Sequence, residues 1–250
     1  MDLSEAPTSM ARRHPWETSR QRFFRRVLRK TGINRSATSV LDVGAGDAWL
    51  SWTLLPVMPQ ARITCLDDAY TPEWIAKNAA RFGSRMRFVA ARPAERFDLV
   101  IALDVLEHVD DDEALLAELA RENLAPDGRM LLSVPAWPLL FGAHDEDLHH
   151  RRRYRPRGMQ ALLGRCGLEA VEKGGLFHSL LVLRVLEIAA ARAGLLRAPP
   201  PDAGDWKGGA LVTKIIDGAL AMDGAVSTSA AKLGLELPGL SWWALCRKRR

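Results

Sequence analysis

The chain contains little cysteine, and the cysteines that it has are widely separated. Its 250 residues include three of them, Cys65, Cys166 and Cys246, and no two form a C-x-x-C pair. A disulfide framework and a cysteine zinc site are therefore not expected, and a reducing compartment is the simpler expectation. We accordingly expect a cytoplasmic protein.

Long hydrophobic runs are also missing. The first 30 residues lack the apolar stretch of a secretory signal, so Sec-type secretion is not expected. The most apolar segment, residues 176–196, is interrupted by Arg184 and Glu187, which leaves less than the roughly 20 apolar residues that a transmembrane helix needs. A buried, lid or dimer helix is favoured there, and a peripheral membrane contact is left open but not favoured.

Positive charge outweighs negative charge only slightly. The chain has 35 Lys+Arg against 30 Asp+Glu, and the basic residues gather at residues 12–13, 20–30, 151–155 and 247–250. Solvated helix faces are the favoured explanation, and an acidic substrate or a membrane surface are alternatives. No helix-turn-helix, zinc-finger or aromatic RNA-binding pattern occurs, so we expect no nucleic-acid partner.

From residue 39 onward, short apolar runs alternate with helical segments. The runs cover residues 40–43, 62–66, 86–90, 97–103 and 129–134. Such runs, apolar throughout, predict strands that are buried on both faces. Between them, Pro72 marks the first turn of one helix, and Asp111 or Asp112 caps another that ends at residues 126–128. The alternation predicts an α/β fold with a parallel sheet.

The segments divide the chain into four parts. Residues 1–38 are expected to form a basic, partly helical arm, and residues 39–175 the core. Residues 176–237 form a helical insertion, broken at Pro199–Pro201, and residues 238–250 a final strand with a basic tail. The insertion is expected to be a lid, a dimer element or a surface contact, and a homodimer is left open.

The most informative segment is the turn that follows the first predicted strand. Gly44 and Gly46 allow a tight turn and a close approach of a ligand to the backbone. A dinucleotide site would have a small residue at the position of Trp49, and the negative charge of Asp47 would repel a pyrophosphate. No G-K-[ST] follows, which disfavours a P-loop. The turn fits a phosphate-free ligand whose amine or cationic part lies near Asp42 and Asp47.

An acidic residue at the end of the second predicted strand extends this reasoning. Asp67 stands 23 residues after Gly44, and it is expected to accept hydrogen bonds from ribose hydroxyls. A nucleoside that carries a sulfonium and an amino-acid tail meets all of these conditions. The sequence therefore predicts S-adenosylmethionine as the ligand.

Four segments resemble the class I S-adenosylmethionine-dependent methyltransferases. Residues 40–49 resemble the first motif, D-x-G-x-G-x-G, with Ala48 in place of the third glycine, and residues 63–67 resemble the second motif. Residues 97–109 resemble the fourth-strand motif, F-D-x-V followed by V-L-E-H-V, and residues 126–131 resemble the turn into the fifth strand. The third motif departs from the family, because arginine and proline replace its usual adenine-contacting acid.

The resemblance implies a fold, a cofactor and a set of binding residues. The fold would be a Rossmann-like three-layer sandwich with a mostly parallel seven-stranded sheet, an antiparallel last strand and a helical insertion before that strand. The cofactor would be S-adenosylmethionine, with S-adenosylhomocysteine as the product and no metal. The implied cofactor-binding residues are Asp42, Gly44, Ala45, Gly46, Asp67, Asp68 and Asp104.

Two further segments narrow the resemblance to bacterial small-molecule methyltransferases. They are H-P-W-E at residues 14–17 and D-x-x-L-x-H-x-R-R-Y at residues 145–154, where His149 replaces the usual glycine. Ubiquinone-pathway O-methyltransferases are also similar, so a hydroxyl of a biosynthetic intermediate is the favoured acceptor. Methylation of nitrogen or carbon, and a lipid- or glycan-linked acceptor, stay open. A non-catalytic partner protein is disfavoured, because Asp42, Gly44, Gly46 and Asp67 occur together.

A hydroxyl acceptor needs a base, and histidine is the default candidate because its ordinary pKa lies near neutrality. His150 is the preferred base, with His149 and His108 as alternatives, since all three follow strands that end at the ligand edge. The residues expected to bind the acceptor are His144, Arg152, Arg153, Tyr154, Trp137 and Phe141. The basic residues and Tyr154 could instead anchor their own loop, and the aromatic residues could be core. A metal on the histidine cluster is disfavoured.

Overall fold

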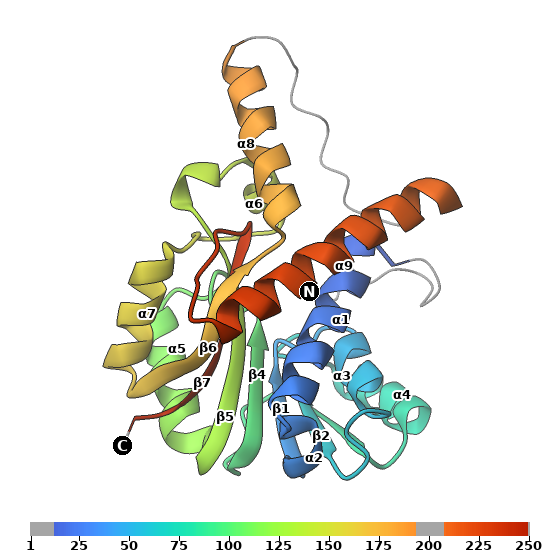
Figure 1. Cartoon of the computed structure of the whole chain (residues 1–250). Helices are drawn as coiled ribbons and strands as arrows, with labels where there is room; N and C mark the ends of the chain where they lie inside the picture. The colour runs from blue at the N-terminus through green and yellow to red at the C-terminus, as the bar shows by residue number, and fades with distance from the viewer. Residues whose placement is uncertain (1–12, 194–207, 250) are drawn as a thin grey trace.

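The apolar runs predicted as strands lie in one seven-stranded sheet in the computed structural model, which describes residues 13–193 and 208–249 (Figure 1). The strands are β1 (Ser39–Val43), β2 (Arg62–Leu66), β3 (Met86–Val89), β4 (Phe97–Leu103), β5 (Leu124–Pro135), β6 (Leu168–Leu176) and β7 (Ser241–Lys248). Their order in the sheet is β3-β2-β1-β4-β5-β7-β6. The first five pair in parallel, and β7 runs antiparallel to both β5 and β6, which confirms the predicted fold class.

Helices cover both faces of this sheet. They are α1 (Pro15–Lys30), α2 (Ile33–Ser36), α3 (Trp49–Leu54), α4 (Pro72–Phe82), α5 (Asp112–Glu118), the π-turn η2 (Leu119–Asn123), the 3-10 turn η3 (Pro138–Leu140), α6 (Ala143–Asp147), α7 (Pro156–Arg165), α8 (His178–Arg192) and α9 (Ala210–Lys232). Both predicted helix starts are confirmed. Thr71 caps α4, accepting from the amide of Trp74 at 3.2 Å, and Asp111 caps α5, accepting from the amide of Ala114 at 2.8 Å.

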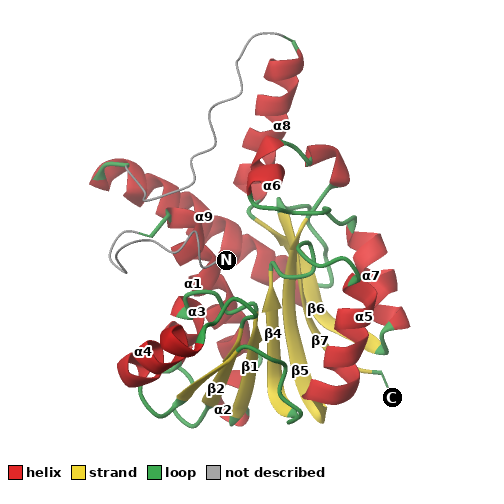
Figure 2. Ribbon diagram, turned by 180° about the vertical axis from the view of Figure 1, so that it is seen from behind, coloured by secondary structure: helices red, strands yellow, loops and turns green. Residues whose placement is uncertain are grey.

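Two hydrophobic cores explain why the strand segments are apolar throughout. Successive side chains of a strand point to opposite faces, so Val40 packs under α1 and α3 while Leu41 packs under α5 and α7. Trp243 and Trp242 divide between the same two cores. Figure 2 shows α5 and α7 on the face opposite α1 and α9. Because helices cover both faces of the sheet, polar residues do not alternate regularly with apolar ones along the strands.

The boundaries of several strands differ from those predicted, by one residue at the start of β1 and at the end of β3 and by more in β5. β5 begins at Leu124, so residues 126–128 lie within its irregular start and do not end the preceding helix. The pairing of β4 with β5 shifts register between Phe97 and Leu99, which accommodates this segment. β7 occupies Ser241–Lys248 within the predicted final segment, residues 238–250, and β6 was not delimited from the sequence because polar residues and glycines interrupt it.

The insertion contributes α8 and α9 between β6 and β7. A chain of hydrogen bonds fixes α9 to the sheet, because the Trp243 indole donates to Ser227 Oγ at 3.0 Å and that hydroxyl donates to the Gly175 carbonyl at 2.6 Å. In Figure 1, α8 projects away from the body. The predicted break at residues 199–201 lies outside the described residues, as do residues 1–12 and 250. Among the helices that are described, none is long and apolar enough to cross a bilayer.

We expect substitution of Gly175 to destabilise the fold strongly. A Cβ at Gly175 would lie 2.3 Å from the Gly239 amide nitrogen and 2.4 Å from the Leu237 carbonyl oxygen, and neither backbone atom can move freely. Gly175→Ala should lower the free energy of unfolding by roughly 3 kcal/mol. Gly218→Ala is the matched control, since its Cβ meets no atom within 4 Å in the middle of α9. It should stabilise the protein by about 0.5–1 kcal/mol. Equal urea midpoints for both variants would contradict this packing.

Candidate functional site

The parallel strands β1, β2, β4 and β5 end at one edge of the sheet, and the loops that follow them meet there. The loop after β1 turns through Gly44 and Gly46, whose φ angles are 63° and 53°. A Cβ at Gly44 would lie 2.9 Å from a methyl carbon of Val105, which follows β4. The turn and the contact between these loops both need glycine, as the sequence predicted.

Asp67 binds this glycine loop directly. Its carboxylate accepts from the Gly46 amide at 2.8 Å and from the Ala69 amide at 3.1 Å. The Tyr70 hydroxyl donates to the Gly46 carbonyl at 2.7 Å from the same side. Asp68 is exposed, and the structure does not bring it to the loop. Of the two neighbouring acids, Asp67 is therefore the one that contacts the glycine turn.

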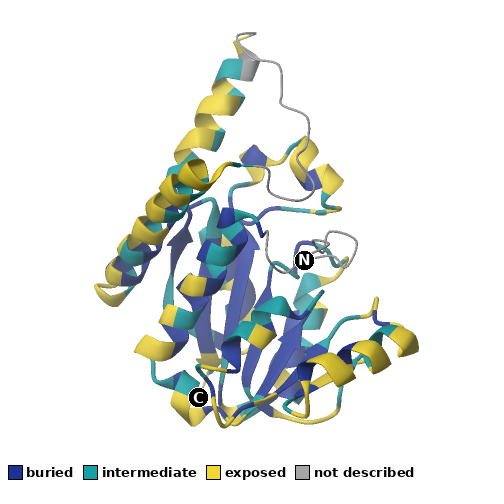
Figure 3. Cartoon of the chain, turned by 90° about the vertical axis from the view of Figure 1, so that its right-hand side faces the viewer, coloured by how far each residue is buried: buried dark blue, intermediate teal, exposed yellow. Residues whose placement is uncertain are grey.

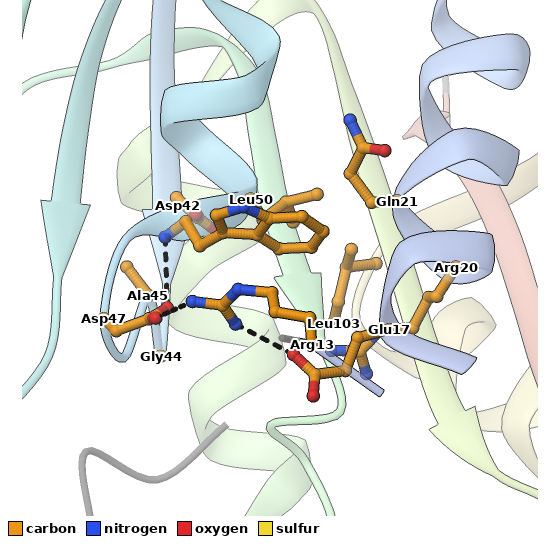
Figure 4. Close-up of a pocket in the computed structure, with 11 residues that line it drawn as sticks. Arg13, Glu17, Arg20, Gln21, Asp42, Gly44, Ala45, Asp47, Leu50 and Leu103 are labelled. Carbon is orange, nitrogen blue, oxygen red and sulfur yellow. Dashed lines mark hydrogen bonds and ion pairs between the residues drawn. The ribbon is translucent and has the colours of Figure 1, made fainter. Parts of the chain in front are cut away.

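A pocket opens beside the glycine loop, between β1 and α1 (Figure 4). Asp42, Gly44 and Ala45, three of the residues expected to bind the cofactor, line it. Asp42 is buried and accepts a hydrogen bond from Ser51 Oγ at 2.7 Å, and burial raises the pKa of its carboxyl to about 6. The other lining residues are Arg13, Glu17, Arg20, Gln21, Asp47, Trp49, Leu50 and Leu103.

Four of these lining residues come from the N-terminal arm, to which sequence reasoning gave no role in the site. Arg13 lies over the Trp49 ring, 4.3 Å from its centroid, and forms ion pairs with Asp47 and with Glu17 at 2.8 Å (Figure 4). The spacing of Arg13, Glu17 and Arg20, four and three residues apart, would have indicated that they share one side of a helix.

Asp104 joins the arm to the ends of β4 and β5. It pairs with Arg20 and accepts from Ser133 Oγ at 2.8 Å. The Arg20 guanidinium also lies over the Trp16 ring, 4.8 Å from its centroid. Asp104, expected to bind the cofactor, is therefore engaged by Arg20 of α1 and does not itself line the pocket.

Across the same edge, a buried carboxylate organises the loop after β5. Asp145 has no exposed surface and accepts from His150 Nδ1 at 3.0 Å and from Arg153 Nε at 2.7 Å. Burial raises the pKa of Asp145, but these hydrogen bonds outweigh it, so the net pKa is lowered and the carboxylate is ionised at neutral pH. The His150 ring also packs edge-on against the His108 ring, with 4.8 Å between their centroids.

Glu107 lies beside these histidines and is fully buried. Neither oxygen of its carboxyl has a hydrogen-bond partner, and burial raises its pKa to about 8. Donor atoms of Glu107, His108 and His150 lie within 4.8 Å of one another, a grouping that could hold a metal ion. His144 and His149, which sequence analysis grouped with His150, are exposed and do not belong to it. The expectation of no metal stays a prediction.

Three residues expected to bind the acceptor instead contact the protein itself. Arg152 donates to the Val109 and Asp110 carbonyls at 3.0 and 2.9 Å. Arg153 is buried on Asp145, and the Tyr154 hydroxyl contacts Leu106 and Asp112. These contacts match the alternative that Arg152, Arg153 and Tyr154 anchor the loop after β5. They give the buried charges of that loop hydrogen-bond partners within the protein, which burial requires.

The two aromatic candidates differ in their surroundings. The Trp137 indole donates to the Gly239 carbonyl at 2.7 Å, and its ring is partly packed against the core. Phe141 is 38% exposed at the end of η3 and is therefore accessible to an acceptor. Phe141 and His150 both lie in the segment that follows β5.

Comparison with known proteins identifies related sequences. Residues 12–173 match the methyltransferase domain family. A ubiquinone biosynthesis O-methyltransferase from Salmonella paratyphi A is 31% identical over 103 residues, which are 38% of this chain and 41% of that protein. One from Pseudoalteromonas translucida is 28% identical over 166 residues, 56% of this chain and 67% of that protein. The chain thus matches less than half of the Salmonella protein's length.

Solved structures with the same fold extend over most of the chain. A candidate sarcosine dimethylglycine methyltransferase from Galdieria sulphuraria superposes with a TM-score of 0.57 at 17% identity, covering 92% of this chain and 85% of that one. The mitomycin 7-O-methyltransferase MmcR gives a TM-score of 0.51 at 14% identity, covering 85% and 49%. At these identities, the likeness concerns the fold.

Asp67→Ala should weaken binding of S-adenosylmethionine. The change removes the acceptor expected for the ribose hydroxyls and also the acceptor for the Gly46 amide, so the loss should be roughly 1.5–3 kcal/mol. Asp68→Ala is the matched control and should bind normally, because its side chain is exposed. Titration calorimetry measures both dissociation constants. Equal affinities for the two variants would remove Asp67 from the site.

Glu107 should make stability depend on pH. Its carboxyl stays protonated in the folded protein until about pH 8 but ionises near its ordinary pKa of 4.5 in the unfolded chain. Raising the pH through this window therefore favours unfolding. Between pH 5 and 9, the wild type should lose roughly 3–5 kcal/mol relative to Glu107→Gln, which stays neutral. Urea unfolding at several pH values tests this, and a pH-independent difference would show that Glu107 is ionised throughout.

Proposed function

The chain belongs to the methyltransferase domain family, with the fold of the class I S-adenosylmethionine-dependent enzymes, and we propose that it methylates a hydroxyl of a small molecule. The proposal rests above all on the pairing of His150 with the buried Asp145 carboxylate, in the segment that follows β5. The two curated relatives are named as O-methyltransferases, which supports oxygen as the acceptor atom.

The residues at the donor side fit S-adenosylmethionine. The Gly44 position leaves a space that a Cβ would fill, and Asp67 stands where a ribose would meet the glycine loop. Asp42, Asp47 and Arg20 line the pocket, where an ammonium would meet the two carboxylates and a carboxylate would meet the guanidinium. Asp47 and Arg20 would exchange their present partners, Arg13 and Asp104, for these groups. The cofactor supplies an electrophilic methyl group on a sulfonium. The protein's part is to hold donor and acceptor in line, which lowers the entropic share of the barrier.

At the acceptor side, Asp145 orients His150 for proton transfer. The ionised carboxylate accepts a hydrogen bond from Nδ1–H, which leaves the lone pair of the ring on Nε2. His150 Nε2 then accepts the hydroxyl proton while the acceptor oxygen attacks the methyl carbon. Asp145 also stabilises the imidazolium that forms, and Arg153 keeps Asp145 ionised. This is the general-base arrangement in which a carboxylate fixes the tautomer of a histidine.

Replacement of His150 tests the proposal. His150→Ala should lower turnover by roughly 10²–10⁴-fold on hydroxylated aromatic acceptors while leaving cofactor affinity unchanged, because the donor pocket lies elsewhere. His149→Gly is the matched control, since His149 is exposed and its φ of 55° suits glycine. Release of S-adenosylhomocysteine measures turnover, and calorimetry measures cofactor binding. Wild-type turnover and pH dependence in His150→Ala would exclude it as the base.

A further inference from the structure

Large hydrophobic side chains are exposed along the two helices of the insertion. Their exposed fractions range from 45% to 77%. They are Val182, Leu183, Val185 and Leu186 on α8, and Leu211, Val212, Ile215, Met222, Val226 and Leu233 along α9 and at its end. Figure 3 shows these helices coloured largely as exposed, projecting beyond the sheet. Apolar surface of this extent on a folded protein marks a binding surface.

On α9 the exposed side chains form one continuous line, which we call the apolar stripe. At 3.6 residues per turn, Leu211, Ile215, Met222, Val226 and Leu233 fall within roughly 60° of the helix circumference. The opposite side of α9 is buried against α1 and the sheet, with Leu220 and Ser227 at its centre. The stripe therefore faces away from the protein's own core along the whole helix.

Basic side chains border the apolar stripe. Lys214 and Lys232 are exposed along one edge of α9, and α1, which lies beside α9 in Figure 1, presents Arg26 and Lys30 to solvent. Burial lowers the pKa of Lys30, and the positive charges of Lys232 and Arg26 lower it further. The three groups on the two helices are therefore close enough to act as one basic cluster.

The acidic residues of this region are mostly engaged within the protein. Asp217 of α9 accepts from Arg22 at 2.7 Å, and Asp223 accepts from the amide and hydroxyl of Ser179 at the start of α8. Glu187 pairs with Arg184 on α8. Glu172 of β6 is the acid that faces Lys30. The edge of the apolar stripe that carries Lys214 and Lys232 is therefore positive.

We propose that the apolar stripe and its basic border bind the surface of an anionic lipid bilayer. An amphipathic helix with an apolar face and flanking lysines lies in the plane of the lipid headgroups, which needs no membrane-spanning length. A second copy of the chain fits less well. An antiparallel two-fold pairing through the stripe would set the basic edge of one copy along the basic edge of the other, with like charges opposed.

The position of the surface connects it with the acceptor side. α8 contacts the loop at η3, and a Cβ at Gly142 would lie 3.4 Å from the Arg184 guanidinium. Leu139 in η3 is 80% exposed, so the exposed apolar surface continues through η3 as far as Phe141. Lipid binding itself does not depend on the proposed methyl transfer, so the two proposals can fail separately.

Vesicle flotation tests the proposal with the full chain. It should float with vesicles of phosphatidylcholine and phosphatidylglycerol at 3:1 and only weakly with phosphatidylcholine alone. Ile215→Glu should weaken partitioning by more than roughly tenfold, since it places a charge in the stripe. Lys232→Gln should weaken it by about fivefold. Ala76→Glu and Lys77→Gln on the exposed side of α4, at the opposite edge of the sheet, are the matched controls and should bind as the wild type does.

Two results would overturn the proposal. One is equal partitioning of Ile215→Glu and Ala76→Glu, with circular dichroism and cofactor binding unchanged in both. The other is failure of the wild type to float, together with a dimer in sedimentation velocity that Ile215→Glu converts to a monomer. That second result would assign the apolar stripe to a homodimer interface.

Discussion

The hydrogen bond from the Gly46 amide to the Asp67 carboxylate is the contact on which the donor side depends. It joins the loop after β1 to the end of β2, and the Tyr70 hydroxyl supports it from the same side. The close approach of Gly44 to Val105 then joins this loop to the one after β4. Because parallel strands end at one edge, these short contacts align three loops without a long connecting segment.

The acceptor side depends on a charge that is buried away from water. Asp145 is ionised within the protein because His150, Arg153 and a backbone amide surround it with hydrogen-bond donors. A buried carboxylate without such partners would take up a proton, as Glu107 does next to it. Two neighbouring acids therefore have opposite protonation states at neutral pH, and the difference arises from their partners.

The N-terminal arm and the insertion connect the proposed donor site with the proposed lipid-binding surface. The arm supplies Arg13, just before α1, and Arg20 of α1 to the proposed donor pocket, while α1 also packs against α9. Arg26 and Lys30 of the basic cluster are on the solvent side of α1. An element that precedes the sheet thus takes part in the proposed donor site and in the proposed lipid surface.

The sequence by itself determined the α/β class and the glycine turn, and it singled out Asp67 as a ribose acceptor; the hydrogen bond of Asp67 to Gly46 was visible only in the structure. These features depend on local patterns: apolar runs, helix caps, and glycine where a turn needs it. Only the tertiary structure decided that Arg13 and Arg20 line the pocket, that Asp145 holds His150, and that Arg153 and Tyr154 anchor their own loop. These contacts depend on how the chain packs. The hydrophobic pattern of a sequence does not show which partner a buried charge will have.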